Sequence, residues 1–188
     1  MVIYVIEHLE PKVFKWCLIE YKNISKIIGK ENLWFTNIKR KNKNLEKLGK
    51  VFKESVSKLN LKNACVLDPE ANKTLSPSEA KQFDYFIFGG ILGDYPPRKR
   101  TTPELTSKIK NAEARNIGKK QMSTDNAVLV TKEIENGIPI EKMKFVGKLT
   151  IKINDIESIE LPYSYPIING KPQISEELVN YLKKKKSF

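Results

Sequence analysis

The sequence contains few of the residues on which several kinds of site depend. Its 188 residues include two Cys, one His and four Arg. Cys17 and Cys65 are far apart and belong to no CxxC motif, so neither a disulfide framework nor a structural zinc site is expected. His8 is the single His of the chain, so it cannot form a metal-binding pair with a second His. A Ser-His-Asp triad would have to use His8, and the sequence contains no nucleophile elbow. We therefore expect no metal.

Long apolar runs are also absent. No run approaches the roughly 18 residues that a membrane-spanning helix needs. Met1 leads directly into the apolar stretch 2–6, without the basic region or the cleavage site of a secretory signal. We therefore expect a cytoplasmic protein that does not associate with membranes.

Charge of one sign dominates the chain. The chain contains 34 Lys and Arg and 22 Asp and Glu, which gives a formal net charge of +12. Thirty of the cationic residues are lysines. A chain rich in Lys and Ile and poor in Cys resembles hyperthermophile proteins, in which such charge is a solvated surface feature. A pI near 9.5 is equally the electrostatic signature of a protein that contacts nucleic acid or a ribonucleoprotein. Composition leaves both explanations open.

The hydrophobic pattern of the first half alternates between strand and helix. An apolar fraction of 40% in a chain of this length suffices for the core of one domain. We expect strands at 2–6, 33–35, 64–67 and 85–88, and helices at 12–28, at 45–59 and from Ser76 onward. This order predicts an α/β fold with a mainly parallel sheet and helices on both faces.

The second half is richer in Gly, Pro and polar residues. These residues concentrate in 89–102 and 117–126. Beyond them we expect a helix at 123–136, a strand at 145–153, an extended segment at 158–168 and a last helix from Ser175.

Two loops have the composition of a ligand site. The loop that follows strand 85–88 contains three glycines, then two prolines, then Arg98 and Arg100, although the glycines alone also fit a tight corner. It matches neither GxGxxG nor GxxxxGK[ST]. The loop 117–125 runs into a helix, whose first amides bind polar groups, although Ser123 or Thr124 also fits a simple cap. Glu7 and His8 end the first strand at the same sheet edge.

Several motifs together resemble one branch of the SPOUT superfamily of methyltransferases. They are Ile6-Glu7-His8, FDYFIFGGILGD at 83–94, PPRKRT at 96–101, GKKQMSTD at 118–125 and Leu161-Pro162-Tyr163. Members of this superfamily use S-adenosyl-L-methionine and have a C-terminal half tied in a trefoil knot. The branch includes a eukaryotic protein-arginine methyltransferase that modifies a ribosomal protein.

The resemblance implies one domain over residues 1–188. Its Rossmann-like part would span about 1–84, and its knotted, cofactor-binding part about 85–188. The implied cofactor residues are Gly89, Gly90, Leu92, Gly93, Ile117, Gly118, Gln121, Met122, Thr124, Leu161, Pro162 and Tyr163. The residues implied to bind substrate are His8, Arg98 and Arg100.

Methyl transfer to a guanidinium needs carboxylates, because the guanidinium is charged at working pH and must be oriented and deprotonated. The motifs point to Glu7, Asp94 and Asp125 as catalytic carboxylates, with Glu7 as the orienting group and with Glu10 and Glu20 as more distant candidates.

Three functions follow from the resemblance. The first is methylation of an arginine in a basic ribosomal protein or ribosomal particle, by a monomeric enzyme that also contacts RNA. The second is methylation of rRNA or tRNA, which the net charge favours through phosphate attraction. The third is a cofactor-binding, ribosome-associated module without catalysis, against which the full set of motifs argues.

Overall fold

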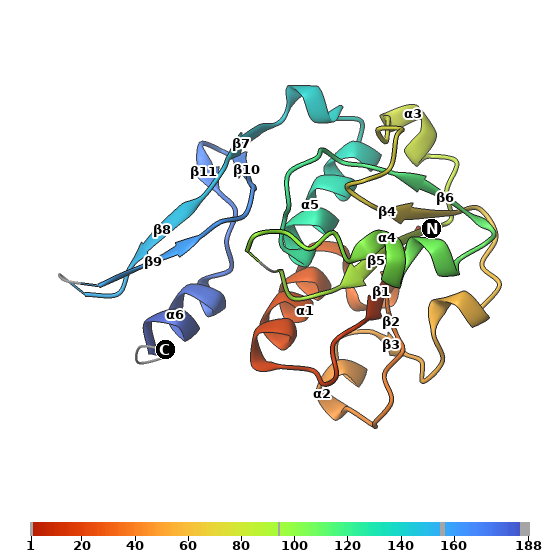
Figure 1. Cartoon of the computed structure of the whole chain (residues 1–188), viewed down its shortest axis with the longest axis horizontal. Helices are drawn as coiled ribbons and strands as arrows, with labels where there is room; N and C mark the ends of the chain where they lie inside the picture. The colour runs from red at the N-terminus through yellow and green to blue at the C-terminus, as the bar shows by residue number, and fades with distance from the viewer. Residues whose placement is uncertain (1, 94, 155–156, 185–188) are drawn as a thin grey trace.

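The computed structural model describes residues 2–93, 95–154 and 157–184, and its centre is a parallel sheet (Figure 1). The strands are β1 (Ile3–His8), β2 (Leu33–Thr36), β3 (Lys50–Val51), β4 (Ala64–Leu67), β5 (Tyr85–Gly90) and β6 (Ala112–Arg115). They are arranged in the order β3-β2-β1-β5-β4-β6, and every neighbouring pair is parallel. The predicted α/β class with a mainly parallel sheet is therefore confirmed.

The two central strands, β1 and β5, begin with continuous apolar runs because both of their faces are covered, and the polar Glu7 and His8 come only at the end of β1. β1 lies between β2 and β5, with Val5 opposite Trp34 on one side and Ile87 on the other. Val5 and Ile87 are fully buried. This register brings the carboxyl ends of β1, β2 and β5 to one edge of the sheet.

One face of the sheet is covered by long helices. They are α1 (Lys15–Ile28), which the 3-10 turn η1 (Lys30–Asn32) follows, and α5 (Thr124–Glu135), with the short α3 (Pro77–Ala80) beside them. Tyr21 and Ile24 of α1 and Val130 and Ile134 of α5 belong to one buried cluster with strand residues such as Phe86. The predicted helices in these three regions are confirmed.

The other face is covered by shorter segments. They are η2 (Val56–Lys58), α4 (Thr101–Glu104) and η3 (Thr106–Lys108). Val56 and Leu105 pack there against Val5, Val66 and Ile87.

The prediction of one helix over 45–59 is wrong. The region contains only α2 (Lys43–Glu46), then β3, then η2. Its backbone pairs with β2 instead, since the Phe52 amide donates to the Phe35 carbonyl at 2.8 Å. Gly49 permits this pairing, because a Cβ at that position would collide with the Leu33 carbonyl. Tertiary pairing thus overrides an apolar spacing that fits a helix.

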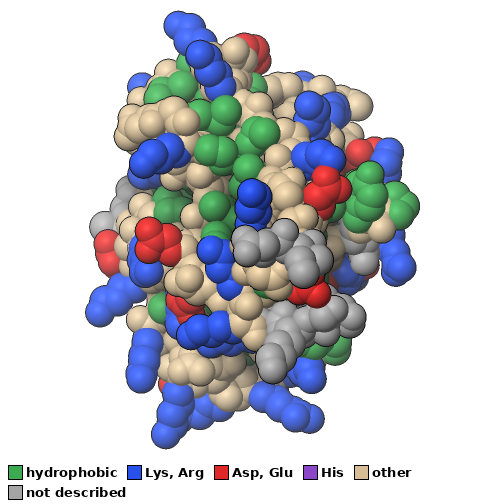
Figure 2. Space-filling model, turned by 90° about the vertical axis from the view of Figure 1, so that its left-hand side faces the viewer, with side chains coloured by type: hydrophobic (Ala, Val, Ile, Leu, Met, Phe, Trp, Pro, Cys, Tyr) green, Lys and Arg blue, Asp and Glu red, His purple; other side chains and the backbone are tan. Residues whose placement is uncertain are grey.

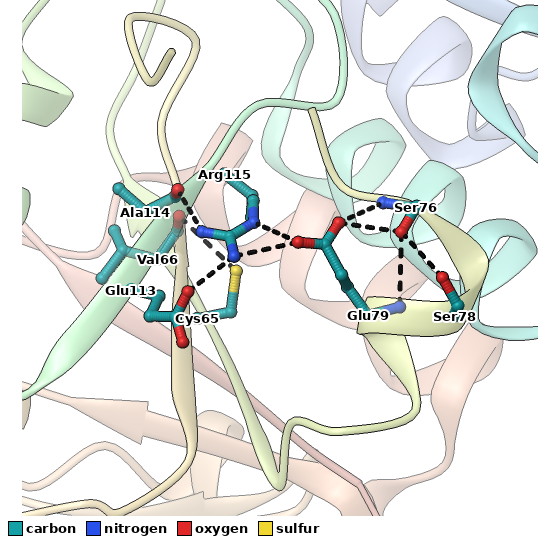
Figure 3. Close-up of polar contacts among 8 residues, drawn as sticks. All are labelled: Cys65, Val66, Ser76, Ser78, Glu79, Glu113, Ala114 and Arg115. Atoms are coloured by element: carbon teal, nitrogen blue, oxygen red, sulfur yellow. Dashed lines mark hydrogen bonds and ion pairs between the residues drawn. The ribbon is translucent and has the colours of Figure 1, made fainter. Parts of the chain in front are cut away.

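β6, which the sequence did not predict, is an edge strand fixed by the guanidinium of Arg115 (Figure 3). Arg115 donates to Glu79 Oε1 from Nε at 3.1 Å and from Nη2 at 3.0 Å, and Nη2 also donates to Glu113 at 2.5 Å. Glu79 belongs to the capping box that Ser76 begins, so this network joins α3 to the sheet edge.

The C-terminal part forms a smaller unit against α1. Its elements are η4 (Ile140–Lys142), β7 (Lys144–Val146), β8 (Leu149–Lys152), β9 (Ser158–Leu161), β10 (Tyr165–Ile168), β11 (Lys171–Pro172) and α6 (Glu176–Lys184). β7, β10 and β11 form one antiparallel sheet and β8 and β9 another, so the strand predicted at 145–153 is in fact two strands. Tyr165, Leu178 and Leu182 form a buried cluster with Ile19 of α1. In Figure 1 this unit lies beside the central sheet.

In the part of the chain that the structure describes, no helix is both long enough and apolar enough to cross a membrane.

Candidate active site

A cavity of about 430 Å³, the first cavity, opens at the carboxyl ends of β4 and β5. Phe88, Gly89, Thr124 and Ala127 line it together with residues 67–70, 91–93, 97–101 and 117–122. An open parallel sheet binds ligands at this edge, so the cavity occupies the expected crevice.

Eight of the twelve residues predicted to hold the cofactor line the first cavity. They are Gly89, Leu92, Gly93, Ile117, Gly118, Gln121, Met122 and Thr124. Leu161 and Pro162 line neither this cavity nor its neighbour, and Gly90 lines neither. A Cβ on Gly90 would collide with the Tyr21 hydroxyl, so Gly90 permits close packing between α1 and β5.

The first cavity suits S-adenosylmethionine in size and lining. Small-molecule pockets in proteins span about 300–1,000 Å³ and combine apolar walls with a few polar groups. Leu67, Phe88, Ile117 and Met122 supply apolar wall, which matches an adenine ring. Gly118 has a φ of 101°, a conformation that side chains disfavour, so glycine is required where the chain turns along this wall.

Tyr163 and Ser164 hold two loops of the first cavity together. The Tyr163 hydroxyl donates to the Gly93 carbonyl at 3.0 Å, and the Ser164 amide donates to the Gln121 carbonyl at 2.8 Å. A Cβ on Gly93 would collide with Gln121 and Tyr163, so the loops meet too closely for a larger residue.

Glu10 supports the loop that follows β5. Its Oε1 accepts from the Leu92 amide at 3.0 Å and from Arg100 Nη1 at 2.9 Å. Arg100 also pairs with Glu104 at 2.7 Å, and these bonds, led by the one to Glu104, raise its pKa. Arg98 and Arg100, predicted to bind substrate, both line the first cavity, where Arg100 is held by carboxylates of this chain. Asp94 lies outside the described residues.

The loop after β4 was missed as part of the site. Asp68 is buried and accepts from Thr102 at 2.8 Å and from Thr106 at 2.6 Å, which joins this loop to α4 and η3. Lys99 pairs with Glu70 at 2.8 Å between the loops after β5 and β4. The signal was present, since Asp68-Pro69 follows a predicted strand next to the strand whose loop was singled out.

A second cavity of about 440 Å³ adjoins the first. Both are lined by Ile91, Leu92, Gly93 and Met122. The remaining lining of the second cavity comes from the start of α1, the start of α5 and the C-terminal part: Phe14, Lys15, Trp16, Glu20, Ser123, Tyr163 and Tyr181. A ligand bound in the first cavity and a ligand bound in the second would therefore contact the same four wall residues.

One buried carboxyl group, Glu20, lines the second cavity, and a second, Asp125, lies buried behind it and acts on it through its charge. Glu20 is 6% exposed and accepts from Trp16 Nε1 at 2.6 Å. Asp125, 3% exposed, accepts from Asn23 at 2.8 Å and from Ser123 at 2.6 Å. Burial, followed by the charge of Asp125, raises the pKa of Glu20 to about 8, and burial raises the pKa of Asp125 as well. Both groups are buried, and the charge of Asp125 disfavours ionisation of Glu20, so the two carboxyl groups resist joint ionisation.

Glu7 and His8 line neither cavity. The Glu7 carboxylate accepts from Thr36 Oγ1 at 2.5 Å and from the Val56 amide at 2.9 Å, so it joins β1, β2 and η2. His8 Nδ1 lies 2.9 Å from the Tyr21 hydroxyl, and burial lowers the pKa of the imidazole. The structure thus brings Asp125 and Glu20 together and places Glu7 in a separate buried network.

Comparison with known proteins places this geometry in a family. The profile of the family described as "Protein arginine N-methyltransferase SFM1-like" matches residues 3–187. The protein arginine N-methyltransferase SFM1 of Saccharomyces cerevisiae is 36% identical over 200 residues, which cover 96% of this chain and 94% of the yeast protein.

Solved structures agree. The crystal structure of yeast SFM1 complexed with SAH has a TM-score of 0.89 and 35% identity, covering 97% of this chain and 94% of that chain. The complex with SAM has the same TM-score, 34% identity, and coverage of 97% and 90%. A dual-specific Trm10 from Thermococcus kodakaraensis shares the fold at a TM-score of 0.55 and 18% identity, over 75% of this chain and 96% of that one. The predicted kinship with SPOUT protein-arginine methyltransferases is thereby confirmed: this chain belongs to the SFM1-like protein arginine N-methyltransferase family.

Proposed function

We propose that this chain transfers a methyl group from S-adenosylmethionine to the guanidino group of an arginine in a ribosomal protein. The observation that carries the proposal is the pair of adjoining cavities: the first has the size and the apolar wall for the cofactor, and the second is lined by the buried carboxyl group of Glu20. The relatives whose structures contain SAM and SAH support the choice of cofactor.

The first cavity is the proposed cofactor site. When bound, S-adenosylmethionine supplies an electrophilic methyl group on its sulfonium. Leu67, Phe88 and Ile117 shelter the apolar part of the cofactor, while the backbone of the two glycine-containing loops offers hydrogen bonds. Leu92 and Met122, which line both cavities, set the boundary across which donor and acceptor meet.

The second cavity is the proposed acceptor site. A guanidinium presents five N–H donors in a plane, which suits the Glu20 carboxylate, and its flat face stacks on aromatic rings. Phe14, Trp16, Tyr163 and Tyr181 supply such rings around the cavity. Because Trp16 donates to Glu20 Oε1, the carboxylate is held in one orientation before the substrate arrives.

The acid pair handles the proton. Arrival of a cation stabilises the ionised form of Glu20 and releases its proton to solvent. As the new N–C bond forms and the S–C bond breaks, the guanidinium must lose one proton, and the Glu20–Asp125 pair accepts it. Of the carboxylates predicted from sequence, Asp125 is thus retained here as the partner of Glu20, while Glu7 stays an untested alternative.

The remaining features of the proposal concern the setting. We propose that the chain acts as a monomer in the cytoplasm on a ribosomal particle, as the family resemblance implies, and the charge of +12 supports contact with the RNA of that particle. We also propose that residues from about 85 onward form the trefoil knot. The bonds of Tyr163 and Ser164 to the loops at Gly93 and Gln121 support this threading, since they bring three separate segments together.

Labelled cofactor tests the proposal. The chain is incubated with methyl-labelled S-adenosylmethionine and ribosomal particles, and the label is followed through ribonuclease and protease digestion. Label that resists ribonuclease, and that mass spectrometry places on an arginine of one ribosomal protein, is the expected result. Label that ribonuclease releases would instead establish an RNA methyltransferase, and unlabelled particles with an intact cofactor complex would establish a binding module.

A further inference from the structure

The positive charge of the chain is concentrated in one short stretch. Residues 39–53, here called the basic segment, contain seven Lys or Arg and one Glu. Its net charge is therefore +6 in a chain whose total is +12. All seven cationic side chains are exposed: Lys39, Arg40, Lys41, Lys43, Lys47, Lys50 and Lys53. A solvated surface spread evenly over the chain would not produce this concentration.

The basic segment is ordered by its own contacts. Leu45 is fully buried, and the Asn42 side chain accepts from the amides of Asn44 and Leu45 at the start of α2. The Leu48 carbonyl accepts from Ser25 of α1 at 2.8 Å. The cations are therefore displayed on a fixed backbone, which lowers the ordering entropy that a binding partner must overcome.

The cations of the basic segment have no acidic partner within the described part of the chain. This distinguishes them from Lys99 and Arg100 at the first cavity, which are paired with glutamates. A third cavity of about 380 Å³ is lined by four of them, Lys39, Arg40, Lys41 and Lys53. Figure 2 shows Lys and Arg side chains along the lower edge of the molecule, the end at which Figure 1 places α2.

Aromatic rings accompany this charge. Lys50 Nζ lies 5.0 Å from the centroid of the Trp34 ring and 4.9 Å from that of Phe52, and the two rings are 4.9 Å apart. Both rings are half-buried and lie under Lys50, so they hold this cation in place at the end of the segment. Fixed cations that follow a phosphate backbone are the main element of nucleic-acid binding without sequence preference.

The basic segment begins at the same sheet edge as the candidate active site. Asn37, just before it, donates to the His8 carbonyl at the end of β1 at 2.7 Å. Leu9, which follows His8, donates its amide to the carbonyl of Gly90 at the end of β5 at 3.2 Å. Since the loop after β5 lines both cavities, two hydrogen bonds separate the root of the basic segment from the active-site loop.

We propose that the basic segment binds the phosphate backbone of single-stranded RNA and thereby docks the enzyme on a ribonucleoprotein substrate. This inference rests on the proposed function for its second half only. The RNA is bound as a polyanion and is not the methyl acceptor.

Salt-dependent binding to a single-stranded RNA oligonucleotide, without cofactor, tests the first half. The variant replaces Lys39, Arg40, Lys41 and Lys43 with Gln. The matched control makes the same change of charge at exposed lysines that precede β4, β5 and β6, at the opposite sheet edge: Lys62, Lys81, Lys108 and Lys110. If all four cations contact phosphates, the slope of log K against log salt should shrink by about 2–3 in the variant, with affinity at least about tenfold weaker at low salt. The control variant should keep most of the salt dependence and most of the RNA affinity of the unmodified chain.

Three results would overturn the proposal: an RNA affinity too weak to measure in the unmodified chain, equal losses in variant and control, or an unchanged slope in the variant. Methylation assays distinguish a failure of RNA docking from a failure of the proposed function. The variant should label an RNA-free ribosomal protein as fast as the unmodified chain, but should label intact particles more slowly at low salt. Equal rates on particles would refute docking. Failure of every chain to label RNA-free protein would count against the proposed function alone.

Discussion

Glu20→Gln should slow methyl transfer and at the same time stabilise the fold. The substitution keeps the shape of the side chain and an oxygen that accepts from Trp16, but removes the charge offered to a guanidinium. A charge-assisted hydrogen bond of this kind contributes about 1.5–3 kcal/mol. Its loss in the transition state corresponds to a rate about ten- to a hundredfold lower, and loss of the proton acceptor adds to the defect.

The stability change has the opposite sign because the carboxyl is forced to ionise in a buried place. The pKa of Glu20 is about 8 in the folded chain against an ordinary value of 4.5. Between these values the folded chain binds more protons than the unfolded chain, so stability should fall as pH rises, by up to about 1.4 kcal/mol per unit. Below pH 4.5 Glu20 is neutral in both states and costs the fold nothing, and above pH 8 the fold bears the full cost of the buried charge. Glu20→Gln removes this fall and should gain most at pH 8.

Urea unfolding at pH 5, 6.5 and 8 measures the stability difference, and single-turnover labelling of a ribosomal protein measures the rate. In the unmodified chain, kcat/KM should rise with pH and level near pH 8, where Glu20 is ionised before the substrate binds. Glu176→Gln, an exposed change in the first turn of α6, is the matched control. Full activity in Glu20→Gln would refute the acceptor site. A stability difference that does not grow with pH would refute the shared proton.

Three further substitutions test the remaining assignments. Glu7→Gln should lower the free energy of unfolding by about 1–3 kcal/mol in a urea titration and leave kcat/KM nearly unchanged; a large loss of activity with intact stability would restore Glu7 as the catalytic group. Gly90→Val should give a poorly folded chain by circular dichroism, because its side chain would occupy the space of the Tyr21 hydroxyl; a well-folded variant that merely fails to bind cofactor would refute this packing role. Glu10→Gln should weaken binding of the demethylated cofactor about tenfold in calorimetry, because the Leu92 amide loses a charged acceptor, and unchanged affinity would exclude Glu10 as a support of the loop.

The buried strands and the loops that follow them could be predicted from the sequence, because local residue chemistry determines them. Buried parallel strands need continuous apolar runs, and such runs placed β1, β4 and β5 correctly. Because ligand loops follow such strands, the glycine-containing stretch after β5 and the loop before α5 were found from composition. β6 was missed because an edge strand tolerates polar residues, and its sequence, Ala-Glu-Ala-Arg, carries no apolar run.

The second cavity was not predictable in the same way. Its walls come from residues 14–16 and Glu20, from the loops after β5 and before α5, and from Tyr163 and Tyr181 of the C-terminal part. Nothing in the local sequence around Trp16 or Glu20 distinguishes them from other residues on the face of an amphipathic helix. Only the packing of α6 and β10 against α1 reveals that this part of α1 borders a cavity.

The hydrogen bonds of Tyr163 and Ser164 have a consequence for the order of events in a catalytic cycle. One residue pair, just before β10, is bonded to both loops that enclose the first cavity. Tyr163 also lines the second cavity, so a movement of the loop at Gly93 would shift a wall of that cavity as well. If the cofactor product leaves the proposed site by a parting of these loops, its departure disturbs the proposed acceptor site, and an acceptor that contacts Tyr163 would slow exchange of the cofactor.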